Sequence, residues 1–207
     1  MKTFNIFGKI YCLICLIILG LMGCEEKVSK PVPPSDYPKS LAAILNSATE
    51  RNKLTSLGMM IYGGPSGAIP LRAILNVPHK CINDNTIPAN INKRYSNYEY
   101  TFTITTDTLV SYKAVNSSVS DVSSTSRYVK WVDFSNNTTR ITVFFETNGV
   151  FDGVSYKSIR ILSGSVIPNN PTFALFNIYD CFIMLETGPD PDDKVADVGT
   201  IRVFQDK

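Results

Sequence analysis

The chain has 207 residues, and its 20 Lys+Arg against 18 Asp+Glu give a formal net charge of +2. That length suffices for a single domain with a sizeable core. Because the basic residues are not clustered, the sequence lacks the positive stripe that nucleic-acid binding needs. We therefore expect no nucleic-acid partner.

The N-terminal segment reads as a targeting signal. Residues 1–9 carry two lysines and no acid, and an uncharged, mostly apolar run follows from Ile10 to Gly23. A basic start, a short apolar stretch and a small residue at its end are typical of a secretory signal peptide. A membrane-spanning helix needs about 20 apolar residues, and this run is shorter. We predict a signal peptide over residues 1–23.

The four residues Leu21-Met22-Gly23-Cys24 end that run. They resemble the lipobox of bacterial lipoproteins. The resemblance implies cleavage after Gly23 and acylation of Cys24 with palmitate-type chains, which together hold a protein stably on a membrane. Glu25 follows the cysteine, and in Gram-negative lipoproteins a residue other than Asp there favours the outer membrane. Whether the domain faces the periplasm or the cell surface stays open.

Residues 24–36 form the predicted lipidated cysteine and its tether, in which Pro31, Pro33 and Pro34 favour an extended chain. Cleavage removes Lys2 and Lys9, so that 18 basic and 18 acidic residues remain and the net charge of the mature chain is zero.

Residues 37–207 are predicted to form one all-β domain that begins with a short helix. Leu41, Ile44 and Leu45 have helical spacing within residues 35–53. Further on, the segments 98–105 and 139–146 alternate apolar and polar residues, as a strand with one buried face does. Other candidate strands are 57–62, 70–77, 108–115, 127–134, 154–162, 173–178, 180–187 and 198–205. About ten closely spaced strands predict an antiparallel β-sandwich, with a lipocalin-like up-and-down barrel as the alternative.

Two cysteines remain in the predicted domain. Cys12 and Cys15 belong to the signal peptide and Cys24 to the anchor, which leaves Cys81 and Cys181. An even pair in an exported domain predicts a disulfide.

No residue pattern predicts a catalytic or metal site. His79 is the single histidine, and Ser66 in GGPSGA lacks the G-x-S-x-G spacing of a nucleophile elbow. The acidic loop 186–197 could offer calcium-type oxygen ligands but lacks the EF-hand order, so we interpret it as a solvated turn. Its five acids are Glu186, Asp190, Asp192, Asp193 and Asp197.

We therefore expect a cell-envelope lipoprotein without cofactor that binds an envelope protein or a glycan. Two alternatives stay open. One is a carrier of a small apolar ligand, if the strands close into a barrel. The other is an envelope hydrolase.

Overall fold

The computed structural model describes residues 37–63, 74–106, 109–115, 120–133, 139–166 and 175–206. The predicted signal peptide, Gly23, Cys24 and the tether lie outside these residues, and so does Ser66. Among the described residues, no helix combines the length and the apolar character needed to cross a membrane.

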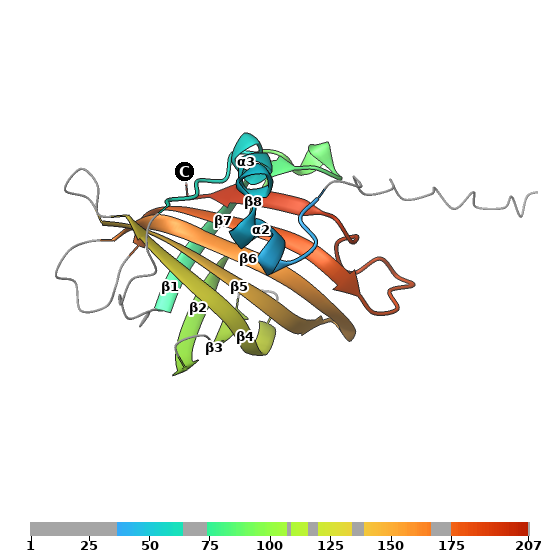
Figure 1. Ribbon diagram of the computed structural model, residues 1–207. Coiled ribbons are helices and arrows are strands. Elements are labelled where there is room, and N and C mark those ends of the chain that lie inside the picture. Colours follow the sequence, from blue (N-terminus) through green and yellow to red (C-terminus); the bar gives the residue numbers. More distant parts are fainter. Residues whose placement is uncertain are drawn as a thin grey trace, which may run out of the picture. The chain divides into compact units, whose positions relative to one another are not determined.

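The described chain consists of two short helices followed by eight strands (Figure 1). The helices are α2 (Leu41–Asn46) and α3 (Ala48–Ser56), and a 3-10 turn, η1 (Pro88–Asn90), follows the first strand. The strands are β1 (Ile74–Asp84), β2 (Arg94–Thr106), β3 (Leu109–Val115), β4 (Ser120–Asp133), β5 (Thr139–Phe151), β6 (Val154–Val166), β7 (Leu175–Thr187) and β8 (Ile201–Gln205).

Each strand pairs with the next in an antiparallel manner, and the last strand also pairs with the first. Cys81 of β1 lies opposite Phe204 of β8, which closes the ring β1-β2-β3-β4-β5-β6-β7-β8 into a barrel. The predicted antiparallel, mostly β domain is confirmed, but the ten-strand sandwich is not. Within the described residues there are eight strands in one sheet, and their order is that of the up-and-down alternative.

The expected ten strands become eight for local reasons. Segment 180–187 and the described part of segment 173–178 belong to the single strand β7, which continues through Asn177 although that residue has a positive φ of 52°. Segment 57–62 is not a strand. It hydrogen-bonds to side chains of the barrel, since the Tyr62 N–H donates to Thr142 Oγ1 (2.8 Å) and the Ser163 hydroxyl donates to the Met60 carbonyl.

The predicted single helix is broken in two at Ser47. The Ser47 hydroxyl accepts a hydrogen bond from the Glu50 N–H (3.3 Å), so this residue caps α3, while Ser40 caps α2 in the same way. Gly58 ends α3 at a φ of 95°, a conformation that favours glycine. There the Met59 N–H reaches back to the Leu54 carbonyl (3.1 Å), and both side chains are buried.

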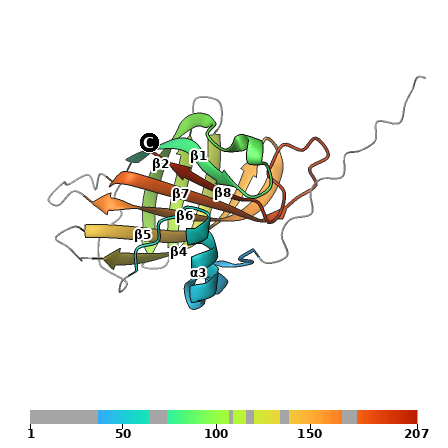
Figure 2. The same ribbon diagram turned by 90° about the horizontal axis from the view of Figure 1, so that it is seen from above.

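Residues 37–62, which we call the N-terminal strap, cover the outer face of β5 to β8. Strap residues Ile44, Leu54 and Met59 share one buried cluster with strand residues such as Phe144 and Ile183. Figures 1 and 2 show both helices alongside the strands, outside the barrel. The strap explains why β5 is buried on both faces at residues 141–145, where alternation predicted one wet face.

The strand residues that alternate with those of the strap-side cluster face the barrel interior. They include a second buried cluster of Cys81, Phe182, Met184 and Phe204, which Tyr156 contacts from the edge. Because neighbouring side chains on a strand point to opposite faces, the strap-side cluster and this interior cluster lie on the two sides of one sheet.

Candidate functional site at one end of the barrel

Three described connections lie at the same end of the barrel, which we call rim A. They are the β1–β2 loop (residues 85–93), the two-residue β5–β6 turn (152–153) and the β7–β8 loop (188–200). The β5–β6 turn is shorter than the predicted connection over 147–153. It consists of Asp152 and Gly153 at φ values of 46° and 85°, the conformation in which an Asp-Gly pair joins two twisted strands.

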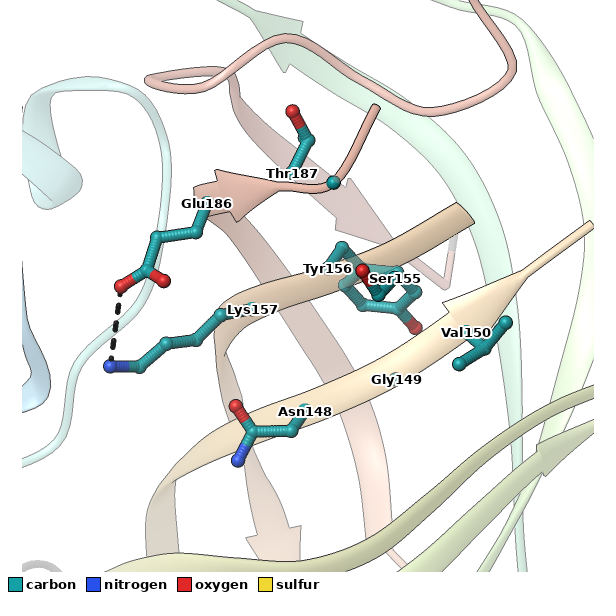
Figure 3. A pocket seen from close by; sticks show the side chains of 9 residues that line it. Asn148, Gly149, Val150, Ser155, Tyr156, Lys157, Glu186 and Thr187 are labelled. Carbon is teal, nitrogen blue, oxygen red and sulfur yellow. Dashed lines mark ion pairs between the residues drawn. The ribbon is translucent and has the colours of Figure 1, made fainter. Parts of the chain in front are cut away.

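Rim A carries an open cleft of about 610 Å³ between the β5–β6 hairpin and the end of β7 (Figure 3). Asn148 on β5 and Lys157 on β6 are register partners, so their side chains lie on the same face of the sheet. The Lys157 Nζ atom is 3.6 Å from Glu186 Oε1 at the end of β7. The other residues that line the cleft are Gly149, Val150, Ser155, Tyr156, Thr187 and Gly188.

Gly188 lets the end of β7 come close to β6 at the floor of the cleft. Its N–H donates to the Ser155 carbonyl at 2.7 Å. A Cβ atom at position 188 would lie 2.5 Å from Ser155 Oγ, a distance that real Cβ contacts do not show. A side chain here would therefore push Ser155 or the strand end away and reshape the cleft.

The cleft offers donors and acceptors together, which suits a ligand rich in hydroxyl groups. Asn148 supplies both kinds of group, Lys157 donates, Glu186 accepts, and the hydroxyls of Ser155 and Thr187 can do either. Glu186 and Lys157 are about 71% and 35% exposed, so water screens their ion pair and either head can turn to a ligand.

Asp84, at the end of β1, holds the opposite side of rim A together. Its carboxylate is 3% exposed and accepts bonds from the backbone and hydroxyl of Thr86, from the Ile87 N–H, from Asn90 Nδ2 and from Arg202 Nε. Burial alone would raise the pKa of Asp84, but the hydrogen bonds, from Asn90 first, outweigh it and the pKa is lowered. The β1–β2 loop is thus a rigid element.

The interior face carries a buried ion pair. Arg160 Nη1 on β6 is 3.0 Å from Asp180 Oδ2 on β7, and its guanidinium lies 4.8 Å from the centre of the Phe182 ring. Ser158 is also buried, and among the described residues its hydroxyl has no hydrogen-bond partner. The interior therefore contains polar side chains, Arg160, Asp180 and Ser158, next to its apolar cluster.

The predicted disulfide between Cys81 and Cys181 is absent, because both are free and buried. Cys181 lies opposite Val203 on β8, whereas Cys81 lies opposite the adjacent residue Phe204. The two thiols therefore point to opposite faces of the sheet. Burial is the main cause that raises the pKa of each thiol.

The other residues considered from the sequence are not brought together. His79 lies within β1, and its register partner is Tyr95. Of the acids in loop 186–197, the Asp190 carboxylate accepts the Lys194 and Val195 N–H groups, while Glu186 lines the cleft. No group of three or more His, Cys, Asp or Glu residues in the described parts of the chain could hold a metal ion.

Asn148 and Lys157 were not among the candidate residues predicted from the sequence. The sequence does contain a pattern that could have identified them. A two-residue Asp-Gly turn at 152–153 places Asn148 and Lys157 opposite one another in the hairpin. Asn148-Gly149 offers a second, competing turn four residues earlier, and so the register was not fixed.

Comparisons with known proteins give no family. No protein-family model matches the chain, and neither a curated protein nor a solved structure is significantly similar to it.

Proposed function

We propose that the protein is a lipoprotein of the bacterial outer membrane, anchored through acylated Cys24, whose barrel is a non-catalytic binding domain. The cleft on rim A is its contact for a glycan. The observation that carries this proposal is the meeting of Asn148, Lys157 and Glu186 from three strands beside an open cleft of about 610 Å³.

The scaffold supports binding more than chemistry. Lys157 on β6 is paired with Asn148 on β5 and with Glu186 on β7, so the backbones of these three residues are already ordered before a ligand arrives. Glycoside hydrolysis uses two carboxyl groups across the scissile bond, and the lining of the cleft contains one, that of Glu186.

A glycan array probed with the full-length protein, extracted from its own membranes, tests the binding function. Asn148→Ala and Lys157→Ala should each lower the signal at least several-fold. The matched control is Lys194→Ala, which removes a lysine from the same rim but outside the cleft. Equal signals for all four proteins would show that the cleft does not bind the glycan.

The anchor is tested separately. Cys24→Ala should move the protein out of the detergent phase, and the mass of the wild-type mature chain should include acyl groups on Cys24. If the variant still partitions fully into detergent, the lipoprotein assignment is wrong.

A second candidate function is transport of a small apolar ligand inside a lipocalin-like barrel. It is favoured by the closed eight-stranded ring, a size that can enclose one small ligand, and by the interior apolar cluster of Phe182, Met184 and Phe204. Native mass spectrometry of the extracted protein distinguishes the two, because a carrier retains a passenger that is lost on denaturation.

A further inference from the structure

The β1–β2 loop of rim A and the start of β2 expose several apolar side chains, of which Tyr95 also contacts the ring of Phe204 edge-on (ring centroids 5.8 Å apart). Ile87 is 45% exposed, and Ile91 and Tyr95 are each 37% exposed. Pro88 and Ala89 between them are exposed as well. Ile87, Pro88 and Ala89 are consecutive, so these apolar side chains are grouped and not scattered, as on a contact surface.

The same loop is basic. Between residues 85 and 95 the chain has Lys93 and Arg94 and no acid. Arg94 lies opposite Lys80 on β1, which adds a third cation beside the apolar side chains. The nearest acid in the sequence, Asp84, is buried and bound to Arg202.

The loop is held in shape before it meets a partner. Besides the Asp84 bonds, the Asn92 N–H donates to the Cys81 carbonyl (2.8 Å), and the Cys81 N–H donates to the Lys93 carbonyl (2.9 Å). Lys93 Nζ also donates to Asn90 Oδ1 at 3.0 Å. A preorganised loop loses little entropy on docking, so even a small patch can contribute to binding.

We propose that this loop docks on the anionic surface of the lipid bilayer. Isoleucine side chains can insert into the edge of the hydrocarbon, and tyrosine is enriched at the membrane–water interface. Lysine and arginine are attracted electrostatically to anionic headgroups. The proposal rests on the lipid anchor proposed above. Cys24 precedes the described chain by 13 residues, so an extended tether reaches no more than about 40 Å and keeps the loop at high effective concentration near the bilayer.

The geometry of the ring keeps the cleft accessible in this arrangement. Two strands lie between the β1–β2 hairpin and the β5–β6 hairpin in either direction around the eight-stranded ring, β3 and β4 on one side and β7 and β8 on the other. They therefore lie on opposite sides of rim A. A barrel that rests on the β1–β2 side turns the cleft away from the bilayer.

The test places a tryptophan at the loop in the full-length lipidated protein. Trp131 is the only tryptophan, so Trp131→Phe gives a silent background. In that background Ile91→Trp reports on the loop. Phe176→Trp is the matched control, since Phe176 is 42% exposed but lies at the start of β7, at the other end of the barrel. Both are reconstituted in phosphatidylcholine–phosphatidylglycerol vesicles that contain brominated lipid, which quenches tryptophan on contact.

We expect quenching of Ile91→Trp and none of Phe176→Trp. Adding Lys93→Gln and Arg94→Gln should lower the ratio of docked to undocked loop about 30-fold, and so should a change to phosphatidylcholine alone. Equal quenching at both positions would overturn the proposal and leave the loop as a protein-binding surface.

Two controls keep the outcome interpretable. Flotation of the wild-type protein with the vesicles is measured first, and protein that does not float refutes the anchor and, with it, the docking. If Trp131→Phe does not fold, hydrogen exchange of the wild-type segment 85–95 replaces the quenching. Slower exchange on anionic than on zwitterionic vesicles supports docking, and identical exchange overturns it.

Discussion

Replacing Asp84 by asparagine should strongly destabilise the barrel. Asparagine keeps one carbonyl oxygen, which can still accept from Thr86 and Ile87, but its amide group faces the donors on Asn90 and Arg202, now 2.8 Å and 2.6 Å from Asp84 Oδ2. Two hydrogen bonds to a buried carboxylate are lost, and Arg202 keeps its charge without its partner. Loss of one member of a buried ion pair costs about 3–5 kcal/mol. Because Arg202 is 22% exposed, we expect the lower end, about 3 kcal/mol.

Urea unfolding measures this directly. With a slope of about 2 kcal/mol per molar, the midpoint should fall by about 1.5 M while the slope stays constant. The matched control is Asp192→Asn, an exposed acid of the same rim whose contact with Lys194 is 3.7 Å long. Its midpoint should change by no more than about 0.25 M. If Asp84→Asn costs less than about 1 kcal/mol, the carboxylate does not hold rim A together.

The same variant gives a pH dependence of known sign. The pKa of Asp84 is lower in the folded chain than its ordinary value of 3.8. The stabilisation by the carboxylate is therefore fully present above pH 3.8 and is lost as the pH falls through the folded pKa. The difference in unfolding free energy between wild type and Asp84→Asn should be constant at neutral pH and should shrink as the pH falls below 3.8. A difference that grows on acidification would contradict the lowered pKa.

Three further outcomes are expected. Because Cys81 and Cys181 are unbridged, reducing agent should leave the melting temperature unchanged, and both thiols should react with a thiol reagent only after denaturation. Arg160→Met and Asp180→Leu should each cost about 3–5 kcal/mol while the double variant costs much less. Additive losses in that cycle would mean that the pair is not energetically coupled. Ser47→Ala should lower stability by about 1 kcal/mol, measured by urea unfolding, because the cap of α3 is removed.

Much of the fold could be predicted because it depends on local pattern. The alternation in residues 98–105 and 139–146 and the turn residues between strands predicted an antiparallel domain, and the structure has strands at both places. The strap's first helical turn was visible in Leu41 and Ile44, which are buried.

The rest depends on contacts that no local pattern contains. Closure of the ring rests on pairs such as Cys81 with Phe204, which lie far apart in the sequence. The cysteine pairing failed for a related reason. An exported domain with an even number of cysteines favours a disulfide. The register of β1, β7 and β8, however, decides which face of the sheet each thiol points to, and a shift of one residue reverses that face.

Rim A gathers the features that point to function. Asp84 and Arg202 fix the β1–β2 side, and the ion pair of Lys194 with Asp152 (3.1 Å) joins the β7–β8 loop to the β5–β6 turn. The exposed loop and the cleft belong to the same closed ring, so the hydrogen-bonded strands between them set their separation. If the loop rests on lipid, the position of the cleft above the membrane is then set by the barrel itself and not by the tether. The lipid anchor would then determine where the protein is, and the rim would determine which way its cleft faces.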